Sequence, residues 1–169
     1  MYTMLSGNPA SNIKMYRGSY LELYFSMLLK KLKNKKAIDD FERSVKLGMS
    51  NIPRAMPSRP DFVLKIGDYN VVLEITLMRP AKTKVSKDMK MEIEGAIRHM
   101  KEQCDNYDKP AGKKSFGIFA AGGCNTVLDD AESDWATTLG VSSYCTMTLL
   151  ELIDLFEHGN RLEIESKLK

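Results

Sequence analysis

The stretch between positions 59 and 77 constrains the fold of this chain more than any other. It contains two runs rich in β-branched and large apolar residues, Phe62–Ile66 and Asn70–Leu77, separated by Gly67 and Asp68. Such runs around a Gly-Asp pair predict two antiparallel strands joined by a tight turn. Side chains alternate along a strand, so Glu74 lies in the middle of an otherwise apolar segment. A carboxylate in that position costs free energy to bury unless something pairs with it.

The predicted hairpin brings a second carboxylate to Glu74. Asp61 enters the first strand just after Pro60, and a hairpin places the start of one strand beside the end of the other. Two carboxylates that converge at a strand end suit a hard divalent cation such as Mg²⁺. The alternative is a solvated Asp in a proline turn and a Glu on the open face of an edge strand.

Composition excludes several classes of protein. The 169 residues are enough for one domain with its own core, and no apolar run approaches the roughly 20 residues of a membrane span. The N-terminal sequence lacks the pattern of a signal peptide, so we expect a cytoplasmic protein. Three separated cysteines and two histidines do not indicate a disulfide framework or a structural zinc site. The net charge of +3 permits nucleic-acid binding without demonstrating it.

The N-terminal part reads as an arm followed by helices. Residues 1–15 are polar and predict a flexible arm, and Tyr16–Asn34 predicts a helix with Ser19 as a candidate N-cap. Glu22 lies at the edge of the apolar stripe of this helix, where it could serve a site or simply interact with the helix dipole. The spacing of apolar residues predicts a second short helix over Ala37–Leu47, followed by an extended connection to the hairpin.

Basic residues flank the hairpin on both sides. They could contact a phosphate backbone, or they could form an ordinary solvated loop. The candidates for contact with DNA are Arg59, Lys82, Lys84, Lys87 and Lys90.

The C-terminal part alternates helices and strands. Lys87–Tyr107 predicts a helix, on which Glu92 and His99 are seven residues apart and share a face. Further along the chain we expect strands over Ser115–Ala121 and Gly140–Cys145, then a helix over Thr146–Glu157 capped by Thr148 or Thr146. The tail from Gly159 is expected to fray, unless Leu162 and Ile164 add an edge strand.

The order of these elements predicts the fold class. It is an α/β (or α+β) sandwich, in which a mixed central β-sheet is flanked by helices. We expect residues 16–169 to form a single domain.

Two motifs resemble a known nuclease superfamily. Pro60-Asp61, followed thirteen residues later by Glu74-Ile75-Thr76, resembles the active-site hairpin of PD-(D/E)xK nucleases, with Thr76 where Lys is usual. The form Leu-Glu-Ile-Thr-Leu is similar to the AlwI-like branch of type IIS restriction endonucleases. Glu92 and Glu94, seven and five residues before the pair formed by Arg98 and His99, also resemble that branch, although its usual proline is absent.

The resemblance implies a restriction-endonuclease-like core and a metal site. Mg²⁺, for which Mn²⁺ would substitute, would be held by Asp61, Glu74 and the carbonyl of Ile75. The resemblance further implies a catalytic set that comprises Glu22, Asp61, Glu74, Thr76, Glu92, Glu94 and His99. Because Thr76 cannot supply the positive charge of Lys, we expect His99, Lys90 or a second metal ion to do so.

The resemblance also implies a function. Double-stranded DNA would be the substrate, and the chain would be the small catalytic subunit of a heterodimeric enzyme that cuts one strand. Because the catalytic core uses nearly the whole chain, sequence recognition would lie in a large partner subunit. The alternatives are a homodimeric nuclease of DNA repair or junction resolution, and an interaction module without catalysis.

Overall fold

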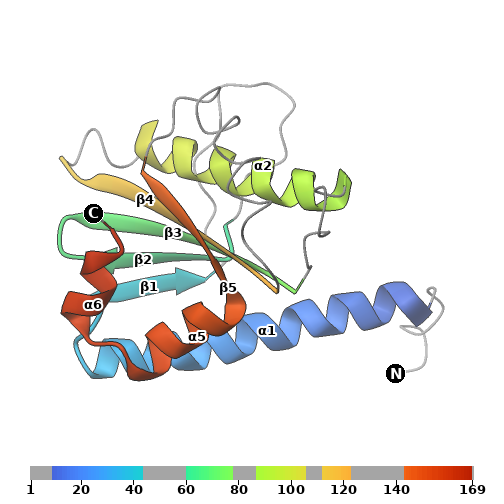
Figure 1. The fold of residues 1–169 in the computed structure, drawn as a ribbon, viewed down its shortest axis with the longest axis horizontal. Helices are drawn as coiled ribbons and strands as arrows, with labels where there is room; N and C mark the ends of the chain where they lie inside the picture. Colours follow the sequence, from blue (N-terminus) through green and yellow to red (C-terminus); the bar gives the residue numbers. More distant parts are fainter. Residues whose placement is uncertain (1–8, 44–59, 78–86, 106–111, 123–142, 169) are drawn as a thin grey trace.

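The protein is a mixed β-sheet with helices on both faces, as the computed structural model shows (Figure 1). The structure describes residues 9–43, 60–77, 87–105, 112–122 and 143–168, with side chains omitted for 9–17 and 88. Five strands are described, namely β1 (Asp40–Arg43), β2 (Phe62–Ile66), β3 (Tyr69–Thr76), β4 (Lys114–Ala121) and β5 (Tyr144–Thr148). The helices are α1 (Pro9–Asn34), α2 (Lys87–Gln103), α5 (Leu149–His158) and α6 (Arg161–Ser166). The predicted fold class is therefore confirmed.

The strands lie in the order β1-β2-β3-β4-β5. β1, β2 and β3 are antiparallel neighbours, whereas β3, β4 and β5 run parallel. The parallel step from β3 to β4 requires a crossover, which α2 provides over one face of the sheet. α1 and α5 cover the opposite face, and α2 is separated from them by the sheet in Figure 1. Within the described part, no helix is long and apolar enough to cross a membrane.

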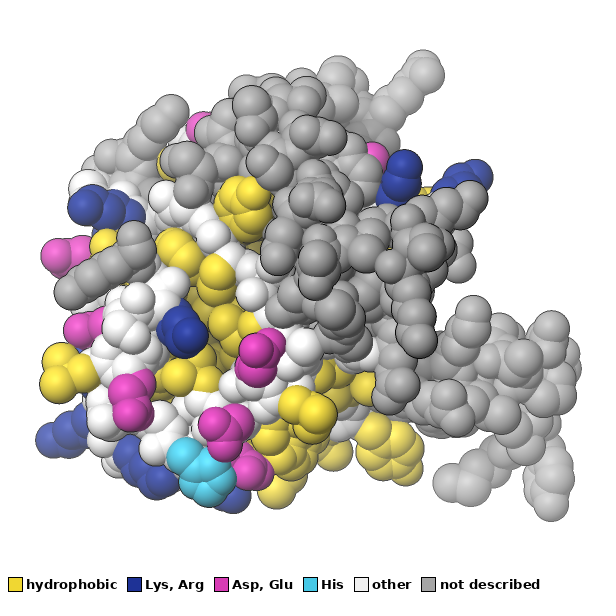
Figure 2. Space-filling model, in the orientation of Figure 1, with side chains coloured by type: hydrophobic (Ala, Val, Ile, Leu, Met, Phe, Trp, Pro, Cys, Tyr) yellow, Lys and Arg dark blue, Asp and Glu magenta, His cyan; other side chains and the backbone are white. Residues whose placement is uncertain are grey.

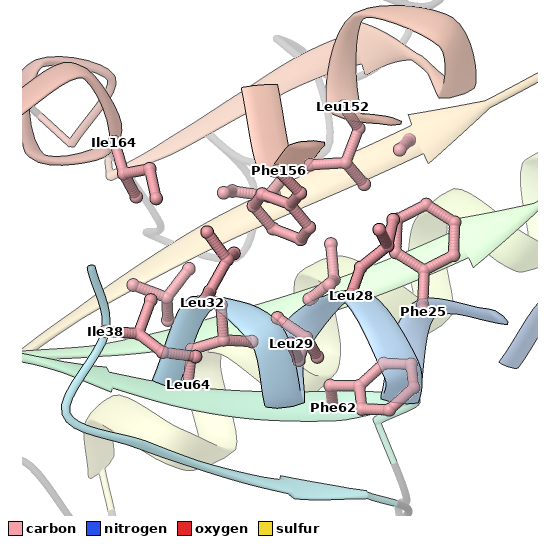
Figure 3. Packing of buried hydrophobic residues seen from close by; sticks show 14 of the residues in the cluster. Phe25, Leu28, Leu29, Leu32, Ile38, Phe62, Leu64, Leu152, Phe156 and Ile164 are labelled. Atoms are coloured by element: carbon pink, nitrogen blue, oxygen red, sulfur yellow. The ribbon is translucent and has the colours of Figure 1, made fainter. Parts of the chain in front are cut away.

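Each face of the sheet has its own hydrophobic core. The larger core packs β2, β3 and β4 against α1 and α5, with Phe25, Phe62 and Phe156 among its fully buried side chains (Figure 3). The smaller core joins Val72 and Phe119 to the inner side of α2. β3 contributes Val71, Leu73 and Ile75 to the larger core and Val72 to the smaller one, as the predicted alternation requires. Glu74 therefore faces the α2 side.

Two N-terminal expectations were wrong. The first helix begins at Pro9, inside the expected arm, and Ser19 lies within it. Proline is favoured at the first position of a helix, so Pro9 was the signal that should have been used. The helix expected over 37–47 is the strand β1 in its described part, and residues 44–47 lie outside the described residues.

The chain leaves α1 through a left-handed residue. Lys36 has φ of 59°, and the Ala37 N–H donates to the carbonyl of Leu32 at 2.9 Å. This arrangement ends the helix and turns the chain back toward β2. Lysine rarely adopts this conformation, so this turn could not be predicted from the residue type.

The C-terminal end is helical rather than frayed or extended. α6 begins at Arg161, and its N-cap is Asn160, whose side chain accepts from the Glu163 N–H in a capping box; Thr148 caps α5 in the same way with Glu151. Thr146–Thr148 belong to β5 instead of the following helix. Arg161 ties α6 to the sheet through two contacts with Asp39, at 2.6 and 3.1 Å. The spacing Asn160-x-x-Glu163 is a capping-box pattern that could have predicted the start of α6 from the sequence.

Large exposed hydrophobic side chains occur on several elements of the described structure, and more of them lie on α1 than on any other element. Figure 2 shows hydrophobic side chains along the lower edge of the molecule, where α1 and α5 lie in the orientation of Figure 1, and also across its middle.

The close packing of α2 on β4 depends on the absence of a side chain at Gly117. A Cβ there would lie 1.4 Å from Met100 Sδ. We expect Gly117→Ala to lower the free energy of unfolding by about 1–3 kcal/mol, because Met100 and α2 must shift. Chemical denaturation measures this change.

Gly95→Ala on the same helix is the matched control. Nothing lies within 4 Å of a Cβ at Gly95. This variant should raise the free energy of unfolding by about 0.5–1 kcal/mol, because alanine favours the helix. Equal changes in the free energy of unfolding for the two substitutions would show that Gly117 does not determine how closely α2 packs on β4.

Candidate metal and phosphodiester site

Asp61 and Glu74 meet at the open end of the β2–β3 hairpin. The register pairs Phe62 with Leu73, so the next positions outward are these two acids. Each carboxylate accepts a hydrogen bond from the opposite side of the hairpin: the Ile75 N–H donates to Asp61 Oδ2 at 2.8 Å, and the Asp61 N–H donates to the Glu74 carboxylate. The backbone of the hairpin therefore helps to orient both carboxylates.

Burial changes the proton affinity of both acids. Desolvation, aided by the charge of Glu74, raises the pKa of Asp61 to about 7 despite the hydrogen bond from Ile75. Desolvation and the charge of Glu92 raise the pKa of Glu74 to about 8. Buried carboxyls that hold protons near neutral pH are typical of sites where a cation or a catalytic step requires the charge.

His99 completes the buried part of the site from α2. Its Nδ1 contacts Glu74 Oε1, and the two side chains are only 11% and 14% exposed. Burial, followed by the charge of Arg98, lowers the pKa of His99 to about 4. Burial therefore favours the uncharged form of both partners.

Two further glutamates act on this pair from opposite sides. The charges of Glu22 on α1 and Glu92 on α2 both raise the pKa of Asp61. Glu22 is held by Arg43, whose Nη2 lies 2.7 Å and whose Nε lies 3.2 Å from Glu22 Oε2. Charges on α1 and α2 thus act on the acid of the hairpin, as the predicted site requires.

Glu94 does not share the position of Glu92. Two residues along an α-helix correspond to a rotation of about 200°. Glu94 is exposed on α2 and is not among the charges that act on Asp61 or Glu74. Of the two glutamates singled out in the sequence, the structure brings Glu92 to the site.

The remaining sequence candidates fall into two groups. Thr76 is buried at the end of β3, and Lys87 and Lys90 are exposed on α2. Arg59, Lys82 and Lys84 lie outside the described residues.

Sequence reasoning missed two side chains of α2. Arg98 was noted only as part of a motif, yet its charge acts on both Glu74 and His99. Glu102 acts on His99, and its Oε2 is buried without a hydrogen-bond partner among the described residues. The spacing 92–95–99–102 places Glu102 on the same face as His99, which is the signal that could have revealed it.

The donor set fits a small hard cation held by few protein ligands. Among the described residues, no three His, Cys, Asp or Glu side chains form a ready metal cluster. Mg²⁺ is commonly held by one or two carboxylates together with water and substrate phosphate. Asp61, Glu74 and the Ile75 carbonyl meet that requirement, and a cation beside the carboxyls would favour their ionised forms.

A family model places the chain among known proteins. The model of the AlwI restriction endonuclease matches residues 12–130, which is more than half of the chain. The chain belongs to the AlwI restriction endonuclease family. All the acids of the site and His99 lie within the matched range, whereas α5 and α6 lie beyond it. No curated protein sequence gives a significant match.

A solved structure supports the same fold for this AlwI-family chain. It is the small subunit, R.BspD6I2, of the heterodimeric restriction endonuclease R.BspD6I, with a TM-score of 0.55. The sequences are 13% identical, and the match covers 88% of this chain and 76% of that chain. At this identity the likeness shows the shared fold.

The raised pKa values predict a pH dependence of stability without metal. The folded state keeps protons that the unfolded carboxyls release near pH 4, so their stabilising contribution is lost as pH rises through about 7 and 8. His99 acts below this window, because its unfolded form titrates near 6.5 and its folded form near 4. Above the range in which His99 titrates, from about pH 6.5 to 8, we therefore expect stability to fall, by up to about 1.4 kcal/mol per pH unit for each carboxyl that still holds its proton, and to level off at higher pH.

Thermal unfolding in EDTA across that range measures this dependence. Asp61→Asn and Glu74→Gln should each flatten the curve, since a neutral amide has no proton to lose. A native curve that rises with pH over the same range would contradict the proposed burial of these two acids.

Proposed function

We propose that this chain is a metal-dependent endonuclease subunit that hydrolyses a phosphodiester bond in DNA. One observation carries the proposal: Asp61 and Glu74 are largely desolvated and joined to each other's strands, with raised pKa values, at the hairpin that resembles the active-site hairpin of PD-(D/E)xK nucleases. Membership of a restriction endonuclease family and the likeness to a restriction-enzyme subunit support this function. Mg²⁺ is the expected cofactor, with Mn²⁺ as a substitute.

Different residues of the chain would have different roles in hydrolysis. When bound, Mg²⁺ would polarise the scissile phosphate and make a neighbouring water a better nucleophile. Asp61, Glu74 and the Ile75 carbonyl would hold it, while Glu22 and Glu92 would add negative charge around the site. Attack of water on phosphorus breaks one P–O ester bond and leaves a phosphate and a hydroxyl end.

His99 and Arg98 are the candidates for the role that Lys has in related nucleases. His99 fixes the orientation of the Glu74 carboxyl through Nδ1. Arg98 carries a permanent charge near Glu74, and it is exposed to solvent at the outer side of the site. We infer that Arg98 stabilises charge on the phosphate and that His99 positions Glu74. Thr76 has no positive charge and cannot stabilise charge on the phosphate as Lys would.

DNA would lie across the exposed basic side of α2. Lys87 and Lys90 precede Glu92 on this helix and are exposed. Phosphate contacts by such residues position the backbone without reading its sequence. The proposal assigns base recognition to a large partner subunit and one strand cut to this chain, in the manner of type IIS heterodimers.

Metal binding is the first test, because it needs neither partner nor DNA. Calorimetry with Mn²⁺ should show binding to the native chain, and at least about tenfold weaker binding to Asp61→Asn and Glu74→Gln. Glu94→Gln is the matched control and should bind as the native chain does. Glu92→Gln should weaken binding by a smaller factor, since its charge acts on both ligands.

The outcomes separate the proposal from its alternatives. Equal binding by native chain and Asp61→Asn would place the metal elsewhere. Absence of binding by the native chain, with DNA present or not, would favour an interaction module over a nuclease.

Cleavage of supercoiled plasmid tests the subunit role. We expect the isolated chain to cut without sequence specificity or not at all, because the proposal assigns base recognition to the partner subunit. Arg98→Ala should reduce any single-strand cutting by about a hundredfold or more, whereas Arg98→Lys should retain part of it. Specific double-strand cutting by the chain alone would favour the homodimeric nuclease.

A further inference from the structure

α1 carries a second apolar stripe on the side that faces away from the core. Tyr20, Leu23, Tyr24 and Met27 are 72%, 51%, 37% and 58% exposed. Their spacing of i, i+3, i+4 and i+7 places them on one face of the helix. We call these four residues the outer stripe. Within the described structure, only one of the two apolar faces of α1 packs against other elements.

α5 extends the outer stripe into a broader surface. Leu150 is 78% exposed and lies seven residues before Glu157, on the same face of α5. Glu157 accepts a hydrogen bond from the Tyr24 hydroxyl at 2.8 Å, which joins the two helices at this face. Figure 2 shows hydrophobic side chains gathered in this region, along the lower edge of the molecule. Contiguous exposed apolar surface of this kind marks an interaction site.

Positive charge follows the outer stripe toward the C-terminal end of α1. Lys30 and Lys31 occupy the next positions of the stripe, at i+3 and i+4 from Met27, and both are exposed. Neither forms an ion pair within the described part of the chain, whereas Lys33 pairs with Asp40 at 2.7 Å. A partner that covers the stripe must therefore meet two available ammonium groups.

The charges of α1 argue against a second copy of this chain as that partner. The helix sequence contains five Lys or Arg and one acid, Glu22, which is engaged by Arg43. Two α1 helices packed through their outer stripes would bring basic residues together in parallel or antiparallel orientation. Like charges in such positions disfavour the pairing.

We propose that the outer stripe is the docking site for an amphipathic helix of the large partner subunit. Apolar residues of that helix pack on Tyr20, Leu23, Tyr24 and Met27, and acidic residues at one of its ends pair with Lys30 and Lys31. This inference rests on the proposed function, because the subunit role requires a partner. Glu22 lies within the same segment of α1 and acts on Asp61, so the docked helix adjoins the helix that supplies Glu22 to the site.

Two synthetic peptides probe the stated chemistry directly. Each forms an amphipathic helix of about five turns with leucines on one face, and its last turn carries glutamates in one peptide and lysines in the other. Fluorescence anisotropy with the full chain should show at least about tenfold tighter binding of the glutamate peptide. Leu23→Glu should weaken that binding by about tenfold or more.

Leu162→Glu is the matched control variant. Leu162 is as exposed as Leu150 but lies on α6, away from the outer stripe, so this substitution should leave peptide binding unchanged. Unchanged melting temperature of both variants shows that each is folded. Equal affinity for the two peptides, no binding of either, or native-like binding by Leu23→Glu would each overturn the proposal.

Sedimentation and metal binding distinguish failure of the proposed docking site from failure of the proposed nuclease function. The chain alone should sediment as a monomer, and a dimer that Leu23→Glu dissociates would assign the stripe to a second copy instead. Leu23→Glu should bind Mn²⁺ as the native chain does, because it is not a metal ligand. Native Mn²⁺ binding lost in Asp61→Asn, together with failure of the peptide test, would refute only the docking site.

Discussion

The reciprocal attachment of Asp61 and Glu74 is the constraint on which the site depends. Each carboxylate accepts from the backbone N–H beside the other acid, so the hairpin register and the acidic pair form one unit. Burial of this pair is unfavourable for two charges, and the protein offsets it by retaining protons. Under the proposed function, a divalent cation would bind the charged form of this pair and release its protons.

The rest of the fold serves to surround that hairpin. β4 runs parallel to β3, which requires the chain to cross over the sheet, and α2 brings Glu92 and His99 over Glu74 in doing so. α1 packs on the other face and carries Glu22, whose charge acts on Asp61 at the open end of the hairpin. Gly117 allows α2 to approach the sheet closely enough for His99 to reach Glu74. The sheet register and the crossover thus account for the positions of Asp61, Glu74 and Glu92, and the packing of α1 accounts for that of Glu22.

Sequence periodicity predicted the parts of this architecture that follow from local physics. The hairpin, β4 and the start of α2 were readable because their apolar alternation and their turn residues agree. β1 was not readable, because a strand of four residues at the sheet edge is selected by pairing with β2 after an unusual turn at Lys36. The start of α1 and the helix α6 both carry helix-start signals, at Pro9 and Asn160. They were not predicted because polar or charged residues surround both signals.

The site could be predicted as a set of residues but not as a set of contacts. The spacing of Glu92 and His99 indicated a shared face, and the hairpin indicated that Asp61 meets Glu74. No local pattern could show that His99 contacts Glu74 or that Arg98 acts on both, since these relations depend on how closely α2 packs on β4. The same holds for Thr76, which has no positive charge: under the proposed mechanism that charge comes from Arg98 on the neighbouring helix instead of the strand.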